Sequence, residues 1–245
     1  MSQRRFIVPR AEAGRALGDW LRGRLSLPAT AVRDLLKRRR VRLDGALCFD
    51  AARRLRPGQR VVELCCGRGN KTLQIASRMR DTGTVLAVDD DAKKIAQTQA
   101  RLDAADIASV ALVTADVTQM QAAPDADAVL LDAPCSGLGI LGRQPEARWR
   151  KNPDDPQRMQ AVQKQLLDAA AQSVKPGGAL VYAVCSTDAR EGEGVVDPFL
   201  AAHPAFTRDA LPERYAPLRT AAGDVLVAPG IDGRDGFYVA RLRRG

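Results

Sequence analysis

The chain has 245 residues, 45% of them hydrophobic and 27% charged, a balance typical of a globular protein and not of a disordered one. This length can hold one large domain and a small one. Residues 1–60 carry 16 Lys and Arg against 5 Asp and Glu (+11), and the remainder carries 22 against 24 (−2), which together give the net charge of +9. Such asymmetry favours a nucleic-acid-binding appendage on a nearly neutral domain.

Several classes of protein are excluded at this point. No apolar run approaches the roughly 20 residues of a membrane span, and the start MSQRRFIVPR has no apolar region behind its arginines, so no secretory signal is expected. We expect a cytoplasmic monomer without a membrane partner. An odd number of cysteines without C-x-x-C spacing argues against a disulfide framework and against a zinc or other metal site. The five are Cys48, Cys65, Cys66, Cys135 and Cys185.

The first predicted elements are two helices and a hairpin. Residues 13–25 place Leu17, Trp20, Leu21 and Leu25 on one helical face, and Pro28 with Thr30 opens a second helix that carries Val32, Leu35 and Leu36. A basic corner follows at residues 37–40, and an Asp-Gly pair at 44–45 predicts a turn between two short strands.

These residues, with R-A-L-G-D-W-L and V-R-D-L-L-K-R-R-R-V-R-L-D-G as the motifs, resemble the alpha-L RNA-binding module over about residues 5–62. The resemblance implies an RNA-binding unit whose basic second helix and corner hold phosphates. We place this small α+β module at residues 1–56 and a large domain at 57–245. Residues 50–62 could belong to either, because R-P-G-Q-R-V-V would end the module and V-V-E-L would begin the large sheet.

From Val61 onward short β-branched runs alternate with helical stretches. Strands are predicted at 61–66, 84–89, 111–116, 128–134 and 179–186, and helices at 71–80, 92–103 and 157–174. This rhythm is typical of an α/β fold, with a parallel sheet and helices on both faces. In such folds ligands bind at the carboxyl ends of the strands.

A candidate cofactor loop lies at 63–69, E-L-C-C-G-R-G, which has the acidic-x-G-x-G-x-G spacing with a cysteine in place of the first glycine. Glycines at 67 and 69 let the backbone turn sharply and approach a ligand. Acidic residues end the next three strands, where the first can accept hydrogen bonds from ribose hydroxyls. The candidate cofactor-binding residues are Cys65, Cys66, Gly67, Arg68, Gly69, Asn70, Lys71, Asp89, Asp116 and Asp132.

Two cysteines stand just past predicted strands, Cys135 in D-A-P-C-S-G and Cys185 in V-Y-A-V-C-S, and should converge at one sheet edge. The tract D-A-P-C-S-G-L-G-I-L-G-R-Q-P-E-A-R-W-R resembles the D-x-P-C-S-G-x-G…R-x-P-E/D-x-R-W pattern of the Sun-type (Fmu) RNA cytosine-C5 methyltransferases. K-P-G-G-A-L-V-Y-A-V-C-S, E-G-E-G-V-V-D-P-F-L-A-A-H-P and D-G-F-Y-V-A-R-L-R-R extend the resemblance over about residues 57–245.

This resemblance implies a Rossmann-like class I methyltransferase sheet, mostly parallel, of seven strands with an antiparallel last strand. It also implies S-adenosylmethionine-dependent methylation of carbon 5 of a cytosine in RNA, with ribosomal RNA favoured. By family analogy Cys185 is the nucleophile, Cys135 assists its release and Asp132 holds the cytosine edge. A thiolate that adds at carbon 6 activates carbon 5. In DNA cytosine methyltransferases the nucleophile comes from the P-C motif, so the pair of cysteines favours RNA.

Two alternatives remain, a tRNA cytosine methyltransferase and a non-catalytic RNA-binding factor in ribosome assembly. The chain also departs from the family loop D-L-C-A-A-P-G-G-K-T at Arg68 and Asn70, which puts cofactor contacts there in question. The target cytosine should be single-stranded or flipped out of its stack. Trp149 could stack on a base, but we expect it to pack in the interior, and the neighbouring arginines could face RNA or solvent equally well.

Overall fold

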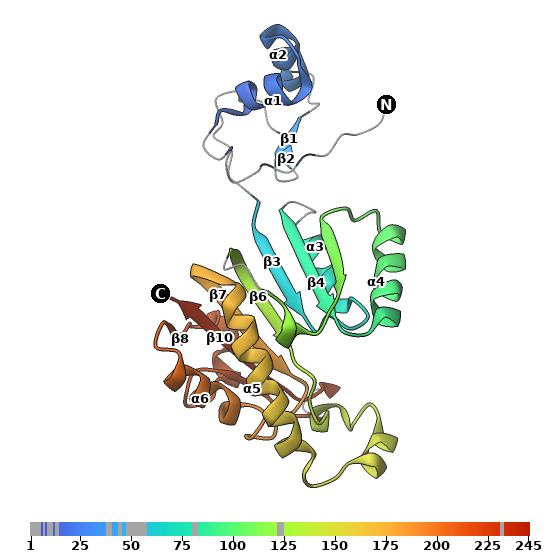
Figure 1. Cartoon of the computed structure of the whole chain (residues 1–245), viewed down its shortest axis with the longest axis vertical. Helices are drawn as coiled ribbons and strands as arrows, with labels where there is room; N and C mark the ends of the chain where they lie inside the picture. The colour runs from blue at the N-terminus through green and yellow to red at the C-terminus, as the bar shows by residue number, and fades with distance from the viewer. Residues whose placement is uncertain are drawn as a thin grey trace.

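The computed structural model describes residues 6, 8, 12, 15–37, 41–43, 46–47, 58–79, 83–121, 125–230 and 233–245. Their buried hydrophobic side chains form two separate clusters, one in the first 41 residues and one in the large domain. In Figure 1 the helices and hairpin of the first part stand above the large sheet.

The small module has the predicted order of helix, helix and hairpin. Its buried side chains lie on the facing stripes of the two helices, and they are Leu17, Trp20, Leu21, Val32 and Leu36. Leu35, also predicted for this stripe, is only half-buried. Residues 38–40 of the basic corner, the turn at 44–45 and residues 48–57 lie outside the described residues. The elements are α1 (Leu17–Leu25), α2 (Ala29–Lys37), and the antiparallel pair β1 (Arg42–Leu43) and β2 (Ala46–Leu47).

The large domain is built on one mixed sheet with the strand order β5-β4-β3-β6-β7-β10-β8, and β9 pairs with β10 beside this path. The first five strands of this order are parallel, and β10 runs antiparallel to β7. The predicted class I sheet with an antiparallel last strand is therefore confirmed, and β9 is a short addition. The strands are β3 (Arg60–Leu64), β4 (Thr84–Asp89), β5 (Val110–Thr114), β6 (Ala126–Asp132), β7 (Val174–Val184), β8 (Phe206–Arg208), β9 (Val225–Val227) and β10 (Phe237–Arg244).

Helices cover both faces of this sheet. In Figure 1 α5 crosses in front of β6 and β7, whereas α3 lies behind β3 and β4, as right-handed crossovers in opposite directions require. None of the helices among the described residues is long and apolar enough to cross a membrane. The helices are α3 (Asn70–Arg78), α4 (Ala92–Ala104), α5 (Asp155–Ser173) and α6 (Glu193–Ala202), with 3₁₀ turns η2 (Val117–Gln119), η3 (Leu138–Ile140), η4 (Pro145–Arg150) and η5 (Glu213–Leu218).

The strand order reverses between β3 and β6, and this places the functional edge. From β3 the chain moves through β4 to β5 on one side, and from β6 it moves to β7 on the other. Ligands of open α/β sheets bind outside the carboxyl ends of the strands at such a reversal. Because β3 begins at Arg60, the segment Val61–Leu64 serves as a central strand of the large sheet.

Two glycines hold the segment after β6 against the segment before β10. A Cβ on Gly139, in η3, would lie 2.1 Å from the carbonyl oxygen of Gly236, so only glycine fits there. The Gly139 N–H donates to the Cys185 carbonyl at 3.0 Å, and the Gly236 N–H donates to the Gly139 carbonyl at 2.7 Å. The loops that follow β6 and β7 and the loop that precedes β10 are thus joined by backbone contacts.

We expect Gly139→Ala to lower the free energy of unfolding by about 1–3 kcal/mol, because the new methyl group must push the two backbones apart. Gly142→Ala is the matched control, since a Cβ there meets nothing within 4 Å. Urea unfolding of both variants measures the difference. Equal midpoints for Gly139→Ala and Gly142→Ala would contradict the tight crossing.

Candidate active site

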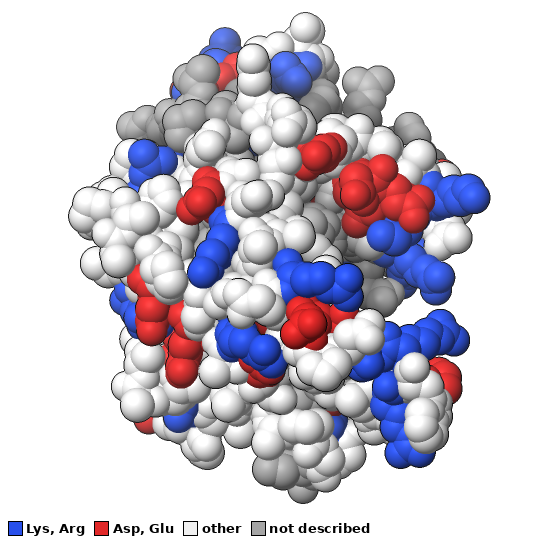
Figure 2. All heavy atoms as spheres, turned by 60° about the horizontal axis from the view of Figure 1, so that its bottom comes forward, with Lys and Arg blue, Asp and Glu red and all other residues white. Residues whose placement is uncertain are grey.

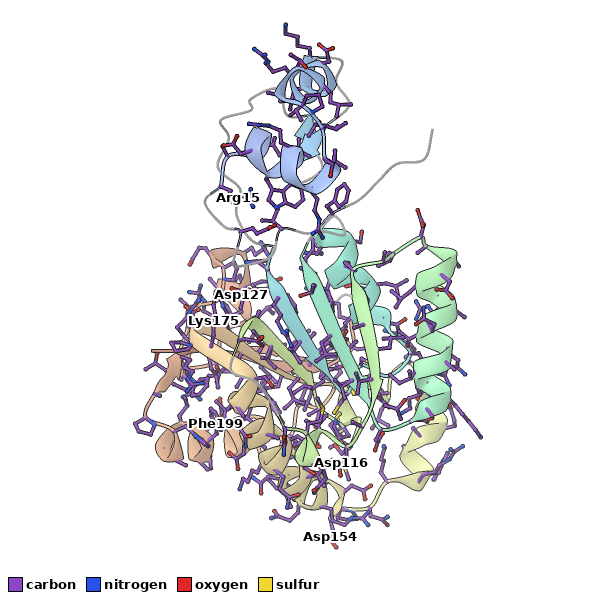
Figure 3. All side chains as sticks on the ribbon, turned by 45° about the horizontal axis from the view of Figure 1, so that its top comes forward. Arg15, Asp116, Asp127, Asp154, Lys175 and Phe199 are labelled. Atoms are coloured by element: carbon purple, nitrogen blue, oxygen red, sulfur yellow. The ribbon has the colours of Figure 1, made fainter. Side chains whose placement is uncertain are left out.

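Two thiols meet at the carboxyl edge of the adjacent strands β6 and β7. Cys185 directly follows β7, and Cys135 lies three residues beyond Asp132, the last residue of β6. Their sulfur atoms are 3.1 Å apart, within hydrogen-bond distance for S–H donors. Figure 3 shows the sulfur atoms (yellow) at the lower end of the strands, at the same end as Asp116. The predicted convergence of the two cysteines is what the structure shows.

The two thiols differ in their affinity for a proton. The pKa of Cys185 is lowered from the ordinary thiol value, chiefly by the hydrogen bond with Cys135 and further by the Lys71 charge, against burial and Asp132. The pKa of Cys135 is raised by the same hydrogen bond, by burial and by Glu191. The hydrogen bond between the two thiols therefore favours the thiolate form of Cys185 and the protonated form of Cys135.

An ion pair lies beside these thiols. Lys71 Nζ contacts Asp132 Oδ2, and both side chains are partly exposed. Lys71 stands in the first turn of α3 and was predicted only as a cofactor residue. The charge of Lys71 lowers the pKa of Cys185, although the Asp132 carboxylate raises it by more. Asp132 keeps its carboxylate at the edge of the sheet, as the sequence predicts.

A buried glutamate fixes the segment that carries Cys135. Glu191 has no exposed surface. Its carboxylate accepts hydrogen bonds from the Ser136 N–H at 2.8 Å, from the Ser136 hydroxyl and from Gln163 Nε2 at 3.0 Å. Its backbone carbonyl accepts from the Tyr182 hydroxyl at 2.6 Å. These bonds hold Cys135 by its chain neighbour and join α5, β7 and the loop after β6.

Sequence reasoning assigned no role to Glu191, Ser136 or Gln163. Glu191 and Ser136 lie inside tracts that carry the family resemblance, and that is the signal by which they could have been found. A glutamate in E-G-E-G reads as a surface residue by composition, because Glu is almost never fully buried without partners. Its burial follows from the folding of the segment after β7 beneath the loop after β6, which no local pattern encodes.

The predicted cofactor loop links β3 to α3, and three of its residues have a left-handed backbone conformation. Cys65 has φ +59°, Gly67 +58° and Gly69 +74°. A Cβ on Gly69 would approach Thr98 to 2.4 Å, so the loop there lies tight against α4. Cys65 occupies a left-handed position, where a non-glycine residue costs about 1–2 kcal/mol. The residue that replaces the first glycine of the motif thus adopts the conformation that glycine would.

The strand-end carboxylates take different environments. Asp89 is buried, and its oxygens accept from the Gly67 N–H at 2.8 Å and the Asp91 N–H at 3.1 Å. Asp89 therefore braces the glycine loop from β4. Asp116 is exposed and accepts from the Thr118 N–H at 2.8 Å, and the hydrogen bonds from Thr118 lower its pKa.

The two departures from the family loop share one partner. Arg101 of α4 donates from Nη1 to Asn70 Oδ1 at 2.8 Å and contacts the Arg68 carbonyl oxygen. Both contacts stand on the outer side of the loop, where the side chains of Arg68 and Asn70 are exposed. The glycine positions that shape the loop are unchanged. Arg101 had no assigned role in the sequence.

Other titratable groups near the loop favour their neutral forms. Burial raises the pKa of the Cys65 and Cys66 thiols to about 12, and the Asp89 charge adds to the effect. Burial also raises the pKa of Glu63 to about 7, although Thr72 and Lys71 oppose it. Of the four described thiols, only Cys185 has a lowered pKa.

The expectation that Trp149 packs in the interior is wrong. Its side chain is 78% exposed in η4, and Arg148 lies over its ring. Arg148 and Arg150 are exposed as well, whereas Arg143 pairs with Asp235. Because η4 buries none of its residues, the aromatic ring finds no apolar partner on its own element.

Comparisons with known proteins agree with this geometry. The 16S rRNA methyltransferase RsmB/F family model matches residues 52–243. The chain is 42% identical over 193 residues to ribosomal RNA small subunit methyltransferase B of Thermus thermophilus, covering 77% of this chain and 46% of that protein. It is 36% identical over 193 residues to ribosomal RNA small subunit methyltransferase F of Klebsiella pneumoniae, covering 76% and 40%. The crystal structure of PH0851 superposes with a TM-score of 0.73 at 33% identity, covering 77% and 43%.

The sheet order, the glycine loop and the carboxylates at the strand ends define a class I methyltransferase domain. With the matching family model, the chain belongs to the 16S rRNA methyltransferase RsmB/F family. The chain spans less than half the length of the curated relatives it matches.

We expect iodoacetamide to alkylate Cys185 first, with a pH midpoint below that of an ordinary thiol, because the thiolate is the reactive form. Cys135→Ala removes the donor to that thiolate and should move the midpoint to higher pH. Peptide mass spectrometry in a Cys48→Ala background measures both. Faster labelling of Cys65 or Cys66 than of Cys185 would refute the assignment.

We expect Glu191→Gln to destabilise the domain by about 1–3 kcal/mol, because the amide replaces one acceptor oxygen by a donor that faces Ser136. Displacement of Cys135 should also slow methyl transfer. Thermal unfolding and methyl incorporation measure the two effects. Glu213→Gln, at an exposed position, is the control and should match the wild type. A variant at position 191 that behaves like this control would show that the network is dispensable.

Proposed function

We propose that the protein methylates carbon 5 of a cytosine in RNA, with S-adenosylmethionine as methyl donor and 16S ribosomal RNA as the substrate. The observation that carries this proposal is the pair of thiols 3.1 Å apart, with the pKa of Cys185 lowered and that of Cys135 raised. The relatives named ribosomal RNA small subunit methyltransferase B and F support the choice of RNA. An unpaired or flipped-out cytosine fits a thiol that must attack the ring face.

The loop after β3 suits a methyl donor of the adenosylmethionine type. Its backbone is open at Gly67, where an added Cβ would meet nothing within 4 Å, so a ligand can approach closely. Cys65 to Lys71 would hold the donor together with Asp116 and Asp132, while Asp89 shapes the loop through Gly67. S-adenosylmethionine, when bound, supplies a methyl group on a positively charged sulfur atom.

Cys185 starts the reaction. Its thiolate adds to carbon 6 of the cytosine, which turns carbon 5 into an enamine-like nucleophile that can take a methyl group. The hydrogen bond with Cys135 lowers the pKa of Cys185 and so favours its thiolate, and the Lys71 charge acts in the same direction.

Asp132 and Lys71 would steady the pyrimidine during this addition. Electron density moves toward N3 as the sulfur–carbon bond forms, so a group hydrogen-bonded at the N3 and amino edge stabilises the adduct. The Asp132 carboxylate lies at the end of β6 beside the thiols and can accept from the exocyclic amine. The ammonium of Lys71 forms an ion pair with the same carboxylate and can stabilise the negative charge that develops on the pyrimidine.

Cys135 acts at the end of the reaction. After methylation a water molecule takes the proton on carbon 5, the C–H electron pair restores the double bond to carbon 6, and the sulfur–carbon bond breaks with its electron pair on the Cys185 sulfur. The S–H of Cys135 can then donate to this thiolate across the 3.1 Å between the two sulfur atoms. Stabilising the departing sulfur accelerates its expulsion and restores the starting state of the pair.

We expect Cys185→Ala to abolish methyl incorporation into RNA while the protein still binds S-adenosylmethionine, because the loop after β3 is untouched. Cys135→Ala should instead accumulate a covalent protein–RNA adduct, visible as a shifted band on denaturing gels. The double variant Cys135→Ala/Cys185→Ala is the control and should form no adduct. Unchanged methyl incorporation by Cys185→Ala would refute the nucleophile.

The RNA itself is identified by bisulfite sequencing of total RNA from cells with and without the protein. A lost 5-methylcytosine in 16S RNA supports the proposed substrate, and one in tRNA assigns the activity to the alternative. Unchanged methylation in every RNA, together with an inactive purified protein, would favour a non-catalytic factor in ribosome assembly.

A further inference from the structure

Trp149 is far more exposed than any other large hydrophobic side chain that the structure describes. It is 78% exposed, whereas the next, Val162, is 39% exposed, and the second tryptophan, Trp20, is buried at 4%. Tryptophan carries more apolar surface than almost any other side chain, so its exposure is costly unless a ligand covers it. Large apolar surface left in water commonly marks a binding site.

One face of the Trp149 ring is in contact with a neighbouring guanidinium group. Arg148 places its guanidinium carbon 4.5 Å from the ring centroid of Trp149, a cation–π arrangement. The guanidinium covers one face of the indole, and the exposure of 78% leaves the other accessible. The segment η4 presents both side chains on its surface, since none of its residues is buried.

The surroundings of the ring are basic. Residues 143–151 include Arg143, Arg148, Arg150 and Lys151 against one acidic residue, Glu146. Within the described part of the chain, Arg148 and Arg150 form no ion pair. When the carboxyl ends of the strands are turned toward the viewer, Lys and Arg side chains gather along the right-hand side of the surface (Figure 2). An open aromatic face among unpaired cations is typical of single-stranded nucleic-acid binding.

The end of this segment lies close to the loop that carries Cys135. The Nζ atom of Lys151, which directly follows η4, lies 3.6 Å from the position that a Cβ on Gly137 would take. Gly137 is the second residue after Cys135. An RNA strand whose cytosine reaches the thiols would therefore pass near Lys151, at the end of this basic segment.

We propose that Trp149, backed by Arg148, is a stacking platform for an unpaired base that flanks the target cytosine, and that Arg150 and Lys151 bind phosphates of the same strand. The proposal rests on the proposed action on RNA and adds the residue that positions the substrate strand. A protein partner is the weaker fit, because the ring is bordered by cations and not by further apolar side chains.

The test is RNA binding by fluorescence anisotropy, with a labelled, unstructured oligoribonucleotide that contains one cytosine and no methyl donor. Trp149→Ala should weaken binding about 5- to 100-fold, the range expected for one stacked base, and Trp149→Phe should restore most of the affinity. Val113→Ala, which removes an exposed apolar side chain on the edge strand β5, is the matched control and should bind like the wild type.

Direct stacking is read from tryptophan emission, because the chain holds only two tryptophans. The Trp20→Phe variant reports Trp149 alone, and its emission should be quenched when the RNA is added. The Trp149→Phe variant reports the buried Trp20 and should change little. Circular dichroism confirms that both variants are folded.

The outcomes separate this proposal from the proposed function. If the wild type methylates RNA but Trp149→Ala binds it with unchanged affinity and Trp149 emission does not respond, the platform is refuted and the activity stands. If the wild type neither binds nor methylates RNA, both the stacking platform and the proposed function are refuted. If Trp149→Ala changes only the sedimentation of the protein and not RNA binding, the ring serves a protein contact and the platform is again refuted.

Discussion

The hydrogen bond between two sulfur atoms is the interaction on which the rest of this site depends. Cys135 and Cys185 come from separate strands, and only their pairing in parallel brings the thiols to 3.1 Å. The hydrogen bond itself is the chief cause of the difference between the two thiols, since it lowers the pKa of Cys185 and raises that of Cys135, with smaller contributions from Lys71 and Glu191. The network around Glu191 fixes the segment that carries Cys135.

The sheet could be predicted from the sequence because its strands are β-branched runs that end in acidic residues or cysteines, and helices fill the gaps. The same pattern predicts that Asp132, Cys135 and Cys185 lie at one edge of the sheet. Burial could not be read in this way. Glu191 looks like a surface glutamate yet is fully enclosed, and Trp149 looks like a core residue yet lies in solvent. Both outcomes depend on contacts between distant segments.

The cofactor loop keeps the backbone geometry of the motif although several of its residues differ. Cys65 adopts the left-handed conformation of the glycine it replaces, and Gly69 preserves the close approach to Thr98. Arg101 donates hydrogen bonds to the side chain of Asn70 and to the carbonyl of Arg68, on the outer side of the loop. The backbone course is therefore maintained by α4, an element that the motif itself does not include.

The crossing of Gly139 and Gly236 sets the time at which the site can form during synthesis. The carbonyl of Cys185 is bound by Gly139, and Gly139 is bound in turn by a residue almost one hundred positions further along the chain. Contacts of such sequence separation close large loops and form late in folding. A growing chain that has not yet released Gly236 from the ribosome cannot form this backbone crossing. The loops around the two thiols therefore take their final arrangement only after the segment before the last strand has been made.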